Sequence, residues 1–250
     1  MHHINQKIAK EYWHKKTGKI VEQAENYSEI STIDHIVVDA CELSYFYTLT
    51  AGSTIAEFTI LIALYNMLLQ RYFDDANAVG SYTMIDSKPL FGYYEFELVE
   101  KKTIKEFLQK TREEVQTVYK YITYAEEHSI FSNPHANYIP FQFYYGISQE
   151  NKDVAFSFLF HVEKKPNNNL EISLRYSKKI VDSVIASHFL IRFKNWLITL
   201  KNNIDVPVFE LPIISDLEKD TLLNKFNFKN FDFTNEFSLA EILPKQANKT

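Results

Sequence analysis

One histidine of this chain stands four residues before an aspartate, a pairing that general acid–base chemistry could use. His35 and Asp39 flank the run Ile36-Val37-Val38, whose β-branched content predicts a short strand. Side chains alternate between the two faces of a strand, so His35, Val37 and Asp39 share one face. A catalytic base also needs a defined geometry and a tuned pKa. The plain interpretation is a surface His–Asp pair, and we assign no catalytic residue.

The other residues that could catalyse a reaction or bind a ligand form no recognisable site. The remaining histidines lack the spacing of metal ligands on one helix face, and the chain has a single cysteine, Cys41, so no zinc site is predicted. No Gly-x-Ser-x-Gly nucleophile motif occurs, and five scattered glycines cannot build a phosphate-binding loop. The sequence therefore predicts no metal site and no cofactor site.

Hydrophobic periodicity predicts alternating helices and strands. Helices are expected at residues 7–16, 55–71, 104–125 and 182–200, with a helical turn at 41–49. Strands are expected at 35–38, 78–84, 93–99, 138–147, 154–163 and 170–176. Two helices begin with capping-box patterns, Ser53-Thr54 with Glu57 and Thr103 with Glu106. In the helix at 182–200, Val184, Ile185, Phe189, Phe193, Trp196 and Leu200 are expected to point largely inward. This order of elements predicts an α/β lobe with a mixed β-sheet packed against helices.

Composition excludes several classes of function. The 250 residues are 46% apolar, enough for a substantial core. A net charge of −5 gives no basic footprint for nucleic acid. The longest apolar stretch, residues 58–69, is too short to cross a membrane, and the N-terminus lacks the pattern of a signal peptide. We expect a cytoplasmic protein that binds neither nucleic acid nor membrane.

Several segments, in order, resemble one enzyme family. Residues 208–218 and 222–227, with their Leu-Pro-Ile-Ile turn and closing Phe-Asn, resemble the end of the condensation domains of nonribosomal peptide synthetases. Glu11-Tyr12-Trp13 resembles the Tyr-Trp signature on the helix that links the first lobe of that family to the second. Further matching segments lie at 52–72, 80, 91–94, 154–163, 170–176 and 180–200. The resemblance implies one chloramphenicol-acetyltransferase-like lobe.

The catalytic motif of that family, His-His-x-x-x-Asp-Gly, is missing. The segment at His35 imitates half of it, but Asp34 precedes the histidine and Ala40 follows the aspartate, and the segment lies after the Tyr-Trp signature instead of before it. The family's loop arginine is absent between Arg71 and Arg112, and Ser157 stands where the family has an aspartate. The resemblance thus implies a second lobe alone, truncated and catalytically inactive.

The resemblance also implies a place in a synthetase. Residues 1–226 would be the truncated condensation-like domain, and residues 227–250 a linker and the start of an adenylation domain, since 237–246 resembles its opening helix. The lobe would then be a structural platform for the adenylation domain of the same polypeptide. Alternatives are half of a split condensation or acyltransfer enzyme that needs a separate first lobe, and a module for dimerisation or carrier docking. Phosphopantetheine would sit on a carrier domain elsewhere, with no cofactor here.

The expected adenylation-domain interface lies in the closing segment. Its candidate residues are Phe209, Leu211, Pro212, Ile213, Leu217, Leu222, Leu223 and Phe226.

Overall fold

The computed structural model describes residues 6–18, 32–73, 76–85, 88–99, 101–131, 139–146, 156–178, 181–214, 219–220 and 223. The chain divides into two compact units, Met1–Leu211 and Pro212–Thr250. All of the helices and strands named below belong to the first unit.

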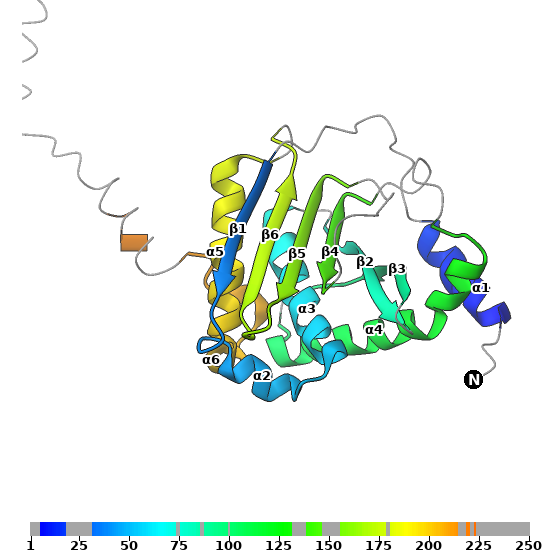
Figure 1. The fold of residues 1–250 in the computed structure, drawn as a ribbon, viewed down its shortest axis with the longest axis horizontal. Helices are drawn as coiled ribbons and strands as arrows, with labels where there is room; N and C mark the ends of the chain where they lie inside the picture. Colours follow the sequence, from blue (N-terminus) through cyan, green and yellow to red (C-terminus); the bar gives the residue numbers. More distant parts are fainter. Residues whose placement is uncertain are drawn as a thin grey trace, which may run out of the picture. The chain divides into compact units, whose positions relative to one another are not determined.

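The first unit is built on a six-stranded mixed sheet (Figure 1). Its strands are β1 (Thr32–Val38), β2 (Ala78–Ile85), β3 (Lys88–Glu95), β4 (Phe141–Tyr145), β5 (Phe158–Lys164) and β6 (Leu170–Tyr176). They lie in the order β1-β6-β5-β4-β2-β3. The β2–β4 and β4–β5 pairs are parallel and the others are antiparallel. The outer strands are thus β1 and β3.

The described helices lie mainly against one face of this sheet. They are α1 (Gln6–Thr17), α2 (Ser44–Thr50), α3 (Thr54–Tyr72), α4 (Ile104–Glu127), α5 (Ser183–Ile198) and α6 (Leu200–Asn203), followed by the 3-10 turn η2 (Val208–Glu210). Figure 1 shows α3, α4 and α5 behind the sheet, with no described helix over the opposite face of β4, β5 and β6. No helix within the described ranges has both the length and the apolar character that a bilayer crossing needs.

An aromatic core joins the helices to the sheet. Tyr65 of α3 is fully buried, and its ring lies 5.5 Å from that of Phe143 in β4 and 5.0 Å from that of Phe160 in β5. Phe189 of α5 meets the same cluster. The alternating burial of β6 places Leu170, Ile172, Leu174 and Tyr176 in this core. Such rings provide both apolar burial and favourable edge contacts.

The predicted fold class is confirmed, and most of the predicted elements are found with shifted ends. The largest shift is in β3, which starts at Lys88, five residues before the predicted strand, and ends at Glu95. Pro89 made this strand hard to predict, because proline removes a backbone donor. β3 is an outer strand of the sheet, where one row of donors faces no strand among the residues that the structure describes, and it therefore tolerates proline.

One prediction about α5 is wrong. Val184 and Ile185 were expected to point inward, but they are 60% and 42% exposed. The buried stripe of α5 comprises Ala186, Phe189, Leu190, Phe193, Trp196 and Leu197. Val184 lies off this stripe and Ile185 lies at its edge in the first helical turn, so the helical period leaves both in solvent. The predicted burial of Phe189, Phe193, Trp196 and Leu200 is confirmed.

Candidate functional site

His35 and Asp39 lie on the surface, as the sequence predicts. Both residues are exposed, and His35 sits on β1 directly opposite Ser173 of β6. Asp39 Oδ1 accepts a hydrogen bond of 3.1 Å from Asn169 Nδ2, and Asn169 Oδ1 accepts one of 2.9 Å from the backbone N–H of Ala40. Asp39 therefore ties the end of β1 to the turn before β6.

Glu57 is a buried carboxylate, and the sequence predicted another role for it. Ser53 caps α3 as expected, accepting from the N–H of Ala56. Glu57 does not reach back to complete a capping box, because it lies one position too far along the helix and points inward. Only 2% of it is exposed. The predicted capping box at Thr103 and Glu106 is confirmed.

Glu57 joins the ends of two parallel strands. Its Oε1 accepts a 2.8 Å bond from Lys164 Nζ at the end of β5, and its Oε2 accepts a bond from the phenol of Tyr145 at the end of β4. Burial, and then the bonded Glu57 carboxylate, raise the pKa of Tyr145 well above its usual range. The phenol therefore stays protonated and donates. Lys164 also lies 4.6 Å from the ring centre of Tyr47, a cation–π distance.

This cluster is suited to holding structure. A nucleophile or general base needs a pKa near the working pH and access to a substrate, whereas the phenol of Tyr145 is held neutral. The three groups fix the beginning of α3 against β4 and β5.

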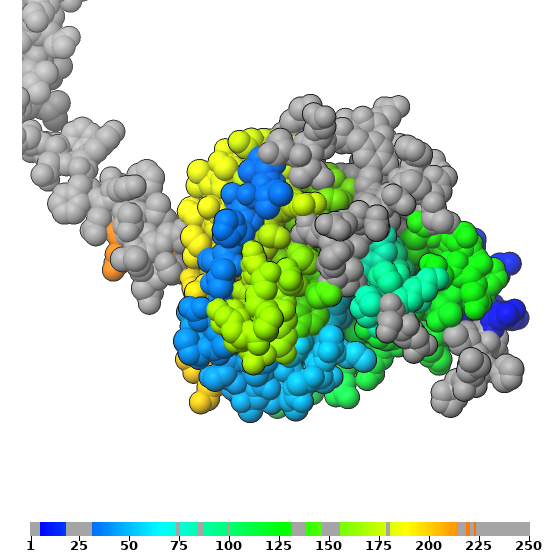
Figure 2. Space-filling model, viewed as in Figure 1, coloured from blue at the N-terminus to red at the C-terminus, as the bar shows by residue number. Residues whose placement is uncertain are grey.

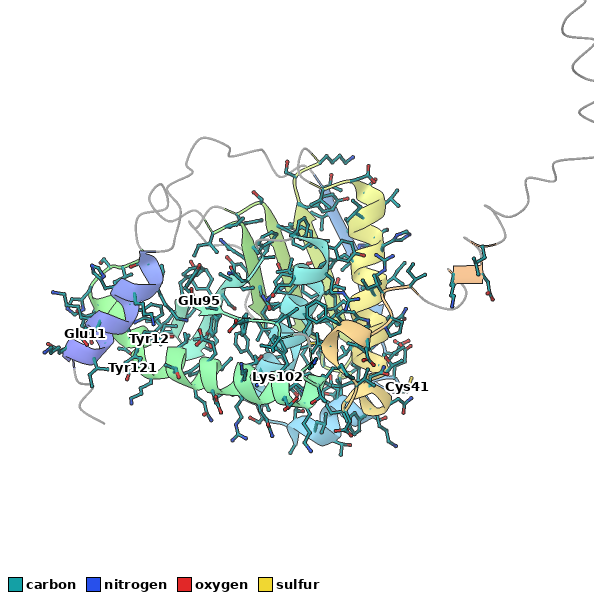
Figure 3. The ribbon with its side chains drawn as sticks, turned by 180° about the vertical axis from the view of Figure 1, so that it is seen from behind. Glu11, Tyr12, Cys41, Glu95, Lys102 and Tyr121 are labelled. Atoms are coloured by element: carbon teal, nitrogen blue, oxygen red, sulfur yellow. The ribbon has the colours of Figure 1, made fainter. Side chains whose placement is uncertain are left out.

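The Tyr-Trp pair of α1 fastens this helix to α4. Trp13 is fully buried and its Nε1 donates a 2.8 Å bond to the carbonyl of Tyr121. Lys16 is 5% exposed, and its Nζ donates a hydrogen bond of 2.9 Å to the carbonyl of Tyr93. The same amino group forms an ion pair with Glu114. Figure 3 shows Tyr12 beside Tyr121, far along α4 from Lys102 at its start. Tyr12 and Trp13 therefore hold α1 against α4.

The closing segment is anchored on the lobe through η2. Val208 is buried. Its N–H donates a hydrogen bond of 2.9 Å to the carbonyl of Lys102, and its own carbonyl accepts a hydrogen bond of 3.1 Å from Arg71 Nη1. The guanidinium of Arg71 lies 5.4 Å from the ring centre of Phe209. Phe209 is nonetheless 42% exposed, whereas Leu211 is buried in the lobe.

The other predicted interface residues lie in the second unit. Pro212 is exposed, Ile213 is half-buried and Leu223 is 49% exposed. Leu217, Leu222 and Phe226 lie outside the described residues.

A groove of about 630 Å³ runs beside α4. Its apolar lining includes Leu49, Ile55, Ile60 and Leu108, and Arg112 also lines it. No group of His, Cys, Asp or Glu within the described part of the chain could hold a metal ion. Cys41 is exposed and its thiol is free.

Similar folds are found among solved structures. No protein-family model matches the chain, and no curated protein matches it. It is similar to the complex of the X-domain and OxyB from teicoplanin biosynthesis (TM-score 0.63, 13% identity, 84% of this chain and 56% of that one). It is also similar to the starter condensation domain of rhizomide synthetase RzmA, in a mutant form in complex with C8-CoA and Leu-SNAC (TM-score 0.62, 10% identity, 84% and 55%).

The chain has a condensation-domain-like fold. It spans about half the length of these structures. The resemblance inferred from the closing segment and the Tyr-Trp pair is thereby confirmed at the level of fold, and the sheet packed against helices agrees with it.

Two features of this condensation-like lobe were missed in the sequence. One is the Glu57 cluster, and the other is the ion pair between the buried Lys16 and the partly buried Glu114. The available signal for Glu57 was a lone carboxylate within the apolar run of α3. Lys16 stands in a lysine-rich helix and has no such signal.

Proposed function

We propose that this condensation-like lobe belongs to a nonribosomal peptide synthetase, does not catalyse condensation by itself, and serves as a platform for the adenylation domain of the same polypeptide. The observation that carries the proposal is the anchored segment Val208–Leu211, which presents Phe209 from a fixed backbone. The proposal rests on the fold for the type of domain and on the resemblance of the closing segment for the partner.

The residues present support the proposed lack of independent activity. The 250 residues contain no His-His-x-x-x-Asp-Gly motif. His35, the histidine whose spacing comes nearest, lies exposed on an outer strand, and the aspartate that follows it is bonded to Asn169. In the resembled family, moreover, catalysis occurs between two lobes.

The way Phe209 is held supports the platform role. Exposed aromatic residues are common anchors of protein interfaces, and an anchor that is already ordered loses less entropy on binding. Both the N–H and the carbonyl of Val208 are bonded to the lobe, and Arg71 covers the neighbouring ring of Phe209. A partner that buries the exposed part of this ring would gain about 25 cal/mol for each Å² of apolar surface.

The first experiment compares the synthetase polypeptide with and without residues 1–226. Soluble yield, thermal unfolding and amino-acid-dependent adenylation would be scored together. We expect the deletion to lower yield or melting temperature while the adenylation chemistry of the surviving protein is retained. Unchanged yield, melting temperature and adenylation would refute the platform role.

A point variant tests the anchor itself. Phe209→Ser in the full polypeptide should lower the melting temperature of the adenylation domain, because the exposed ring can no longer be buried there. Met84→Ser is the matched control, since Met84 is 45% exposed on β2. Equal effects of the two variants would show that Phe209 is not an anchor.

A second candidate function is half of a split enzyme. It is favoured by the sheet face that carries no described helix (Figure 1), because a separate first lobe could approach from that side. Condensation between two carrier-bound aminoacyl groups would then appear only when a lobe bearing His-His-x-x-x-Asp-Gly is added. Absence of activity in the mixture leaves the platform role as the better proposal.

A further inference from the structure

The outer strand β1 has one row of backbone groups without a partner strand in the described part of the chain. It pairs with β6 on one side only, and β6 lies between it and β5. In an antiparallel strand, alternate residues direct their N–H and C=O groups to opposite sides. The Val37 carbonyl points outward, where Lys194 Nζ reaches it at 3.3 Å, so Ile33 and His35 also point their backbone groups outward. Figure 2 shows β1 at the surface.

The side chains of this strand are self-complementary. Ile33 and Val37 are 54% and 44% exposed on the sheet face without described helices, with His35 midway between them. If a second β1 ran antiparallel with its two-fold axis at His35, Ile33 of each copy would lie opposite Val37 of the other. Cross-strand pairs of β-branched residues stabilise a sheet. The register therefore forms two apolar pairs at once.

The helix behind β1 continues the same exposed edge. Val184, Ser187, Ile191 and Lys194 recur at helical spacing on α5, and Lys194 of this stripe reaches the outer side of β1. Val184 is 60% exposed and Ile191 is 47% exposed. Antiparallel joining of two β1 strands would bring the α5 stripes of both copies to the same face of the joined sheet. The edge of β1 and the exposed stripe of α5 thus present apolar side chains to the same partner.

We propose that this edge binds a second copy of the chain, with the two β1 strands antiparallel and centred on His35. The joined sheet has twelve strands and the interface has two-fold symmetry, as most homodimers do. Lys194 must release the Val37 carbonyl for this pairing, but it keeps its 2.8 Å ion pair with Glu42. Each copy supplies a partner strand for the outer row of β1, which faces no strand in the described part of the chain, and this is a form of strand addition.

The test is the mass of the full chain in solution, measured by sedimentation across a wide range of concentration. Ile33→Glu should weaken association at least about tenfold, because it places a charge opposite an apolar residue of the partner. Val37→Lys should do the same. Each new charge lies opposite a residue of opposite charge within its own lobe, because Ile33 is paired with Arg175 of β6 and Val37 with Glu171 of β6. The double variant pairs opposite charges between copies and should restore the dissociation constant to within about threefold.

Controls separate this interface from others. Met84→Lys changes an equally exposed residue on β2 and should leave association unchanged. A wild-type chain that stays monomeric at every concentration overturns the proposal. So does a dimer that is insensitive to both single variants.

Discussion

At the scale of single residues, Glu57 shows how position within a helix decides the role of a carboxylate. One position earlier it would be the third residue after the Ser53 cap, where a glutamate completes a capping box. At its actual position it turns inward and meets Lys164 and Tyr145. A buried carboxylate needs a cation and hydrogen bonds to offset its desolvation, and both are provided. The cluster locks α3 to the ends of β4 and β5.

Removal of Lys164 and removal of Glu57 should lower the free energy of unfolding by different amounts. Lys164→Met leaves Glu57 charged and 98% buried without its cation, since only 2% is exposed, and should cost about 3 kcal/mol. Glu57→Gln leaves Lys164, whose side chain is 32% exposed and can turn to solvent, and should cost about 1–2 kcal/mol. Urea denaturation measures both. The reverse order would contradict the assigned geometry.

At the scale of elements, β3 is fitted to α4 by a glycine. A Cβ added at Gly92 would lie 2.8 Å from Val118 Cγ1 and 3.2 Å from Ile122 Cδ1. Both of these side chains belong to the fully buried face of α4. Gly92 therefore sets how closely this helix approaches the outer strand. The Trp13 and Lys16 contacts that attach α1 depend on the same layer, because they reach α4 and the carbonyl of Tyr93.

Filling this space should destabilise the lobe. We expect Gly92→Ala to cost about 1–3 kcal/mol, because neither neighbour can move within a packed layer. Val118→Ala makes room, so the double variant should lose at least about 0.5 kcal/mol less than the two single variants added together. The free energy of unfolding of all three variants measures this. Strict additivity would show that the contact at Gly92 is absent.

At the scale of the whole molecule, the core is rich in buried tyrosines. Tyr65 and Tyr94 are fully buried, and burial raises their pKa values well above the usual range. Burial, followed by the charge of Glu95, raises the pKa of Tyr93 to about 12. These phenols lie on α3 and β3, two elements that the core joins. Their ionisation is therefore tied to global unfolding.

Alkaline pH should unfold the lobe cooperatively. A raised folded-state pKa contributes stability that is present below the unfolded value of about 10 and is lost as pH rises through the folded value. We expect the melting temperature to fall steeply between about pH 10 and 12, with phenolate absorbance rising in the same step. Ionisation of the buried tyrosines near pH 10 in a lobe that stays folded would contradict this expectation.

The sequence by itself determined the type and order of the elements, the caps at Ser53 and Thr103, the exposed His35 and the resemblance to a condensation lobe. These depend on local periodicity and on neighbours within a few residues. Only the tertiary structure decided the partners of Glu57 and Lys16. Glu57 meets Tyr145 and Lys164 across 88 and 107 residues, and Lys16 meets Glu114 across 98. Such contacts follow from strand order and helix placement, which local periodicity does not encode.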